Sequence, residues 1–336
     1  MTVTVQDFHV IIIGAGATGL LLAQGLKKHD EETYEQRAGQ WTMALHSSLP
    51  YLESTLPPAL HAKLNTATTN PWSEPDPGIA AAIPFVDGAT GEVVAKIPMP
   101  HPKRVVRGKL RDLLRTDVEI RFGMRLTDVR VEDDGVVAVF NGEMVRGSVL
   151  VGADGARCVV RAKVVDTEVA ALEEPNIMVL NAFPSFAREQ ALFIHERSHP
   201  IVQLAPHPHQ QTMANVVDPD KPETWVFHYC LSIWTHEDPP ENTGERRALF
   251  RRFMARYCEP YKSAGEWLSE DTPIPGEKVV YHGADLHTEM DGYDESAYTR
   301  GKQDIDLSSE QMYAYHHWEE IMTSPLTTGG YGASRQ

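Results

Sequence analysis

The sequence has few cysteines, no long apolar run and no recognisable targeting segment. Its three cysteines, Cys158, Cys230 and Cys258, match neither a zinc motif nor a disulfide framework in their spacing. We therefore expect a reducing, cytoplasmic compartment. Residues 1–9 contain no basic segment followed by an apolar core, so no signal peptide is predicted. The longest apolar runs, such as residues 79–83 and 136–140, are far too short to span a bilayer.

Positive charge is also in short supply. Lysine and arginine number 31, against 47 aspartates and glutamates, which gives a formal net charge of −16. Nucleic acids and anionic membranes both require a basic face, so this balance argues against either as a partner. We expect the partner to be a small-molecule substrate.

Signatures of metal and nucleophile chemistry are weak or absent. His207 with His209, and His316 with His317, could ligate a metal, but no convincing further ligands accompany them, so no metal site is predicted. The sequence contains no G-x-S-x-G nucleophile elbow. Trp225, Phe227 and Tyr229 alternate and share one face of a predicted strand, which indicates core packing, although that face could instead line a substrate pocket.

A glycine-rich turn is the first feature that carries chemistry. Gly14, Gly16 and Gly19, with Ala17 and Thr18 between them, form G-x-G-x-x-G after an apolar segment and before a leucine-rich one. In this pattern the first glycine permits a tight turn, the second lets the backbone approach a pyrophosphate, and the third allows close packing of helix and strand. The helix N-terminus stabilises the phosphate charge.

An acidic residue follows at the spacing that a dinucleotide site requires. Glu35 lies about 20 residues after Gly14, at the end of the predicted second strand. An acid there accepts hydrogen bonds from ribose hydroxyls. The alternative is that the glycines only shape a turn and Glu35 is a surface charge.

The second motif is Val151-Gly152-Ala153-Asp154-Gly155-Ala156-Arg157-Cys158, followed by Val159-Val160-Arg161. Together the two motifs resemble the FAD-dependent monooxygenases of the para-hydroxybenzoate hydroxylase type, in particular fungal and bacterial members that resemble enzymes of secondary metabolism. In that family the Asp-Gly element, here Asp154 and Gly155, supports the flavin dinucleotide and the approach of NAD(P)H. Cys158 stands where a serine is usual.

The same resemblance extends to two arginines and reveals one gap. By it, Arg37 and Arg107 are candidates to contact the dinucleotide; the alternative for either is an ordinary surface arginine. The family normally carries a later G-D-A-A-H segment whose aspartate binds the flavin side of the cofactor. Residues 279–287 contain only a faint echo of it, so the resemblance implies that this part of the flavin site is missing.

The expected fold class is α/β, or α+β overall. Residues 1–175 would form a Rossmann-like FAD-binding domain with a β-meander and with insertions around residues 65–105. Residues 176–275 would form a domain on a mostly antiparallel sheet, and residues 276–336 a helical segment. Strands are predicted at residues 8–13, 32–35, 118–122, 126–131, 135–140, 148–151, 177–183, 191–195, 201–205, 212–217 and 225–233, and helices at 20–28, 107–115, 245–257 and 306–322. Residues 41–64 are predicted to be mainly helical, and residues 69–102 to be loops with short strands.

Three functions remain open from the sequence. The first is an FAD-dependent monooxygenase that uses NAD(P)H and O2 to hydroxylate or epoxidise a small aromatic or polyketide-like substrate. The second is a relic of the flavin fold that cyclises or isomerises a natural-product intermediate without redox chemistry. The third is a non-catalytic truncated homologue. The catalytic residues are not identified, because in such enzymes the cofactor performs the chemistry.

Overall fold

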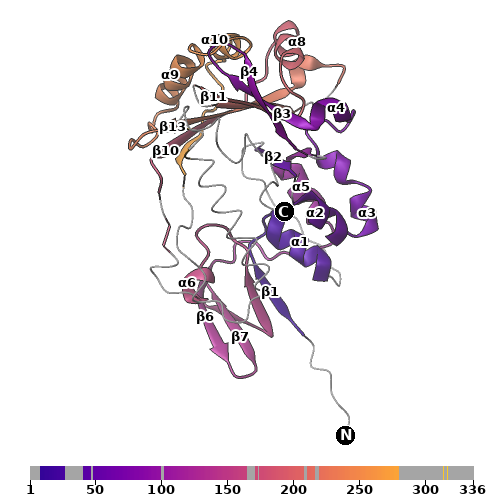
Figure 1. The fold of residues 1–336 in the computed structure, drawn as a ribbon. Coiled ribbons are helices and arrows are strands. Elements are labelled where there is room, and N and C mark those ends of the chain that lie inside the picture. Colours follow the sequence, from indigo (N-terminus) through magenta and orange to yellow (C-terminus); the bar gives the residue numbers. More distant parts are fainter. Residues whose placement is uncertain are drawn as a thin grey trace.

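The computed structural model describes residues 8–26, 41–46, 48–99, 102–164, 171–172, 174–207, 210–215 and 219–279, together with Tyr313 and His316. These residues form a mixed α/β fold, as the sequence predicted. A large sheet covered by helices lies at one end of the molecule, and a short parallel strand pair with a β-meander lies at the other (Figure 1).

The glycine-rich turn lies in the part built around β1 (Val10–Ile13). This strand pairs in parallel with β9 (Val149–Gly152), so that Ile13 lies opposite Gly152. Helix α1 (Ala17–Leu26) follows β1 and packs against α5 (Arg107–Leu114) in a cluster rich in leucine. The side chain of Gln24 fixes this contact, because its Nε2 donates to the carbonyls of Leu114 at 2.5 Å and Thr116 at 3.0 Å.

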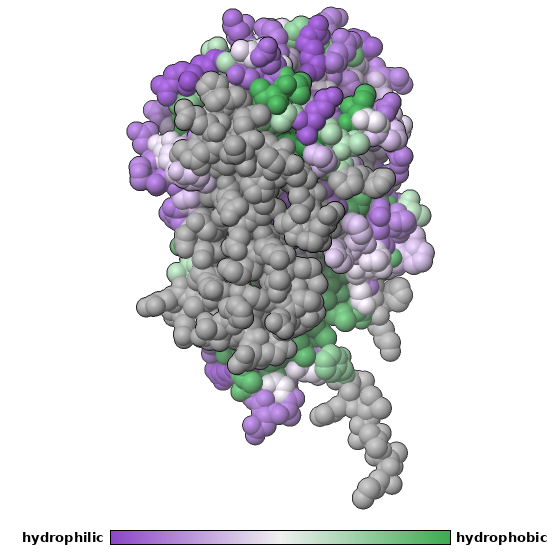
Figure 2. Space-filling model, viewed as in Figure 1, coloured by the Kyte–Doolittle hydropathy of each residue, from purple (hydrophilic) through white to green (hydrophobic). Residues whose placement is uncertain are grey.

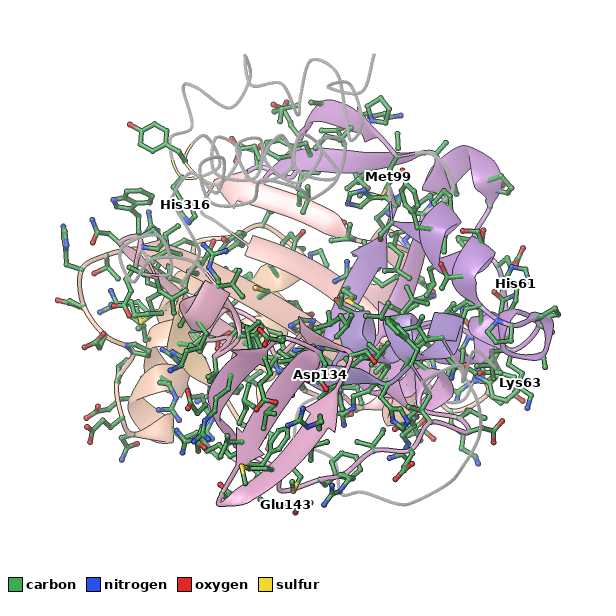
Figure 3. The ribbon with its side chains drawn as sticks, turned by 90° about the horizontal axis from the view of Figure 1, so that it is seen from below. His61, Lys63, Met99, Asp134, Glu143 and His316 are labelled. Atoms are coloured by element: carbon green, nitrogen blue, oxygen red, sulfur yellow. The ribbon has the colours of Figure 1, made fainter. Side chains whose placement is uncertain are left out.

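The predicted β-meander is present and packs beside β9. Its strands are β6 (Leu126–Glu132), β7 (Gly135–Phe140) and β8 (Glu143–Gly147), and all its pairings are antiparallel. Asp134 and Glu143 lie at the two turns of this sheet (Figure 3). A short helix, α6 (Arg161–Val164), follows the second motif.

A two-stranded antiparallel sheet forms where the sequence predicted mostly helix. Thr42 to Leu45 is strand β2 (Thr42–Leu45), paired with β5 (Lys103–Val106). The prediction of residues 41–64 as mainly helical is therefore wrong for its first part, because pairing with a strand distant in sequence decides the conformation there. The rest is helical, in α2 (Leu49–Thr55), α3 (Pro58–His61) and the 3-10 helix η1 (Leu64–Ala67).

The large sheet has the order β14-β10-β13-β12-β11-β3-β4 and is mostly antiparallel, as predicted. Its only parallel pairing among the described strands joins β11 to β3. Its strands are β3 (Ala82–Asp87), β4 (Val93–Pro98), β10 (Ile177–Ala182), β11 (Gln203–His207), β12 (Gln210–Asn215), β13 (Val226–Trp234) and β14 (Gly276–Lys278), and two short helices, α4 (Pro77–Ala80) and η2 (Pro222–Thr224), flank it.

One face of this sheet is the core of the molecule's upper half. Helices α8 (Arg188–Glu196), α9 (Thr243–Met254) and α10 (Tyr261–Glu266) cover it, as Figure 1 shows. Trp225, Phe227 and Tyr229 all lie in this core and are 5%, 0% and 1% exposed, which confirms the interpretation of their alternation as core packing. The next residues along β13 in the alternation, including His228, point to the opposite face.

Two predicted strands are absent from the described structure. Residues 191–195 belong to helix α8, because Ala191 and Ile194 are buried at helical spacing and Gln190 Oε1 accepts from the Ala187 amide at the helix start. Residues 118–122 pack Val118 and Ile120 against the leucine cluster but make no ladder with another described strand. The predicted strand at 32–35 lies outside the described residues, and so does the helix at 306–322 apart from Tyr313 and His316.

The described surface is strongly polar at the end formed by α9 and α10. Hydrophilic side chains gather there, with few apolar ones between them (Figure 2). Among the described helices, none combines the length and the apolar character needed to cross a bilayer.

Candidate functional site

The turn between β1 and α1 depends on close contact with the second motif. Gly14 has φ +108°, a conformation that residues with a side chain rarely adopt. A Cβ there would lie 2.4 Å from the Ala153 carbonyl oxygen and 2.6 Å from the Asp154 nitrogen. The Ala153 amide donates to the Ile13 carbonyl at 2.7 Å. The structure therefore brings together two motifs that are distant in the sequence.

Gly19, in the first turn of α1, is packed just as closely. A Cβ at this position would lie 2.1 Å from the carbonyl oxygen of Gly14 and 3.2 Å from the side chain of Ala153. Only glycine lets the helix start this close to the end of β1. The third glycine of the motif therefore has the packing role that the sequence predicted for it.

Two other glycines face open space. A Cβ at Gly16 or at Gly155 would meet no described atom within 4 Å. The first turn of α1, which includes Ala17 and the exposed Thr18, contains no acidic residue that would compensate the positive end of the helix dipole. Its amide groups have no partner inside the helix. The arrangement offers a bare backbone surface with N–H donors, which suits an anionic group.

Asp154 and Gly155 lie just after β9 and are exposed. Burial raises the pKa of the Cys158 thiol, and a hydrogen bond to Asp154 raises it further. The thiol is therefore held in its protonated form, which donates to the Asp154 carboxylate. Cys158 also packs against Gly152, where a Cβ would lie 2.5 Å from its sulfur.

Arg107 is the first residue of α5 and its side chain is exposed. Its backbone amide donates to the carbonyl of Trp41 at 2.8 Å, which joins the start of α5 to the start of β2. Glu35 and Arg37 lie outside the described residues, as does the echo of the missing segment beyond Val279. Their roles stay predictions.

A buried polar chain, which the sequence analysis missed, crosses from the β2–β5 sheet to the large sheet. We use this name for Arg104, Thr42, His228 and Asn181, which are 6%, 8%, 3% and 0% exposed. Arg104 Nε and Nη2 lie 3.1 and 3.0 Å from Thr42 Oγ1. Thr42 Oγ1 lies 3.1 Å from His228 Nδ1, and His228 Nε2 lies 3.0 Å from Asn181 Oδ1.

His228 is neutral in this environment. Burial lowers its pKa to about 3, and the positive charge of Arg104 adds to the effect. The imidazole therefore acts as a fixed hydrogen-bonding link at ordinary pH and not as an acid or base.

Aromatic rings surround this link. Phe183 stacks on His228 with ring centroids 4.6 Å apart and an interplanar angle of 18°. Trp41 meets the same imidazole edge-on at 5.8 Å and lies 6.1 Å from Phe183. Trp41 and Phe183 are only partly buried, whereas His228 is almost completely so. Because Trp41 also contacts Arg107, the aromatic group lies next to the start of α5.

Sequence reasoning could not assemble this group, since its members come from four separate strands or their flanks. The one available signal was His228, a polar residue between the apolar Phe227 and Tyr229 in a predicted strand. Such a residue must face away from the core that its neighbours form.

Two fungal proteins are among the most similar curated relatives. FAD-dependent monooxygenase phnB of Penicillium herquei is 34% identical over 304 residues, which cover 83% of this chain and 71% of that protein. FAD-dependent monooxygenase cctM of Talaromyces islandicus is 26% identical and covers 96% of each chain. That second alignment extends over 384 residues, more than the 336 of this chain, so cctM contains segments with no counterpart here. No family model matches the sequence.

Solved structures share the fold at low identity. The 2,6-dihydroxypyridine-3-hydroxylase of Arthrobacter nicotinovorans has a TM-score of 0.60 at 12% identity, and the match covers 97% of this chain and 94% of that one. A variant of HpxO from Klebsiella pneumoniae, complexed with FAD, has a TM-score of 0.56 at 16% identity, over 82% of this chain and 69% of that one.

The described residues fit the cofactor that these relatives are named for. Gly16 and Gly155 leave the backbone bare, the start of α1 has no acidic side chain of its own, and Gly14 and Gly19 hold the turn in a shape that only glycine permits. Geometry and similarity thus agree, and the chain belongs to the family of FAD-dependent monooxygenases.

Proposed function

We propose that this protein uses NAD(P)H and O2 to hydroxylate or epoxidise a small aromatic or polyketide-like substrate. The observation that carries the proposal is the contact between the two motifs. Together the turn at residues 14–19 and the turn at residues 153–155 form a site, here called the cradle, in which Gly16 and Gly155 face open space. When bound, FAD supplies the transfer of electrons from the nicotinamide and the activation of oxygen. The protein itself binds the cofactor and the substrate, orients them, and excludes water from the site.

The cradle residues have distinct parts in this proposal. Gly14 and Gly19 shape the turn, and Gly16, Ala17 and Thr18 present backbone amides to the pyrophosphate. Asp154 and Gly155 support the dinucleotide from the β9 side. Arg107 and Arg37 would add forked donors, which suit phosphate oxygens, and Glu35 would accept from the ribose.

The substrate side of the proposal is the face of the large sheet that points away from α8, α9 and α10. Phe183, His228 and Asn181 lie on that face, and Trp41 joins it to the start of α5. In this division of labour, residues 1–175 bind the dinucleotide, apart from insertions around residues 65–105 that belong to the substrate side, and residues 176–275 bind the substrate.

The length difference from cctM supports a second candidate function. Segments present in that relative are missing here. Loss of the flavin-side strand and helix would leave the cradle able to hold the adenosine end but not the ring. The protein would then cyclise or isomerise a natural-product intermediate without redox chemistry.

One measurement separates the two functions. The purified protein is mixed with FAD, passed through a desalting column, and examined by visible absorption. Flavin bands that elute with the protein, followed by NAD(P)H oxidation that an added phenol accelerates, are the expected result. A colourless protein fraction that leaves all FAD in the small-molecule volume would overturn the redox proposal in favour of the flavin-independent one.

A further inference from the structure

The amide of Asn181 ends the buried polar chain with an unused donor. Its Oδ1 accepts from His228, but within the described part of the chain its Nδ2 has no hydrogen-bond partner. The residue is 0% exposed. A buried amide without a partner is costly, and each such group in a folded protein calls for an explanation, of which a bound molecule is one.

The orientation of the Asn181 amide follows from the donors and acceptors along the buried polar chain. Arg104 can only donate, and its Nε and Nη2 both donate to Thr42 Oγ1, so the hydrogen of the Thr42 hydroxyl is the group that faces His228. His228 Nδ1 must therefore accept, from the Thr42 hydroxyl. In neutral His228 the proton is then on Nε2, which donates to Asn181 Oδ1. This fixes the Asn181 oxygen toward His228 and leaves its NH2 group for another acceptor.

Planar side chains lie beside Asn181, the last residue of the buried polar chain. Phe183 neighbours Asn181 in sequence at the end of β10 and stacks on His228, and Trp41 lies 6.1 Å from Phe183. The rings of Trp41 and Phe183 are both partly exposed, although they lie where the β2–β5 sheet meets the large sheet. A flat ring can stack on such surfaces, since offset aromatic pairs are favourable at these separations.

Resting on the proposed function, we propose that Asn181 is a substrate-binding residue whose amide donates to a carbonyl oxygen of a planar aromatic substrate lying against Trp41 and Phe183. Arg104, Thr42 and His228 are positioning residues, because they act on the substrate only through the orientation that they impose on Asn181. The site therefore favours aromatic molecules with a carbonyl at one edge over molecules of the same shape that lack it.

A matched pair of probes tests this selection without turnover. 4-Hydroxyacetophenone and 4-ethylphenol share a ring and a phenol, but only the first has a carbonyl. Their dissociation constants are measured by calorimetry on the full chain with FAD added. We expect the wild-type protein to prefer the ketone by about 10-fold, the typical effect of one hydrogen bond to an otherwise unpaired buried group. The preference should vanish in Asn181→Leu, while the affinity for 4-ethylphenol stays within about 3-fold.

The carbonyl stretching frequency gives a second readout. With 13C-labelled ketone, difference infrared spectra should show a lowered frequency in the wild-type protein and an unshifted one in Asn181→Leu. Thr42→Val should reduce the ketone preference, and Thr42→Ser, which keeps the hydroxyl, should restore it. A ketone preference that persists in Asn181→Leu, or a wild type without one, would overturn the proposal.

The proposal can still be tested if Asn181→Leu fails to fold. If Asn181→Leu binds neither probe, Asn181→Asp replaces it, because an ionised carboxylate keeps an acceptor for His228 Nε2 and has no donor for the substrate, although it also adds a negative charge. An unchanged ketone preference in Asn181→Asp at pH 8 counts against the proposal, and a lost preference supports it. The proposed redox function has its own test in the flavin spectrum, so either can fail alone.

Discussion

Gly14 and Ala153, which lie far apart in the sequence, are packed so closely that a single methyl group on Gly14 would overlap the Ala153 carbonyl oxygen at 2.4 Å. This contact joins the end of β1 to the end of β9. It makes the turn that precedes α1 a shared product of both motifs, so damage to either should affect the other.

Gly14→Ala should destabilise the protein by at least about 2 kcal/mol, because it adds both a clash and a strained φ. The free energy of unfolding is measured by urea titration. Gly142→Ala is the matched control, since Gly142 has φ +94° but a Cβ there would meet no described atom within 4 Å. The control carries only the backbone strain, about 1 kcal/mol. Equal losses in the two variants would show that the contact with Ala153 is unimportant.

Gly16→Ala should leave stability unchanged and weaken FAD binding. Its Cβ would project into open space in the protein alone, but into the path of the pyrophosphate when the dinucleotide binds. We expect the dissociation constant for FAD, measured by fluorescence titration, to rise roughly 10-fold to 100-fold, the equivalent of one or two lost backbone contacts. Gly25→Ala, near the end of α1, meets only an ordinary contact with Thr55 at 3.4 Å and should bind FAD normally.

Arg107→Ala should also weaken FAD binding, by roughly 10-fold, as expected for one charge-assisted hydrogen bond to phosphate. The exposed Arg125, which lies in the turn before β6, provides the matched control. Both variants lose one positive charge, so a difference between them cannot come from net charge. Identical FAD affinities in Arg107→Ala and Arg125→Ala would assign Arg107 to the ordinary surface.

The sequence was most informative where local chemistry determines the structure. The turn from β1 to α1 and the turn after β9 have glycines at positive φ, Gly14 and Gly155, and the local glycine patterns predicted both turns. Helix α8 was missed because the mostly apolar residues from Ala191 to His195 look like a strand when read without Arg188 and Gln190, which lie in the first turn of the helix. Strand β2 was missed because only its pairing with β5 makes Thr42 extended.

The polar chain lay beyond sequence reasoning for a related reason. Asn181 and His228 are polar residues in mostly apolar strands, and nothing near either one in sequence indicates a partner. Their meeting depends on the register of β10 and β13, in which Asn181 pairs with Cys230 and lies diagonally opposite His228. Register of this kind is set by the whole sheet.

The pH dependence of stability tests the burial of His228. The unfolded chain protonates this imidazole near pH 6.5, whereas the folded protein does so only at about pH 3. Between these values only the unfolded state takes up the proton, so the contribution of neutral His228 to stability is complete above pH 6.5 and is lost progressively as the pH falls toward 3.

His228→Gln removes the titration. Its stability deficit relative to the wild type should therefore shrink by about 2 kcal/mol between pH 7 and pH 5. A deficit of His228→Gln that stays constant over this range would mean that the folded protein protonates His228 as readily as the unfolded chain, and the imidazole could then no longer be the fixed link that orients Asn181.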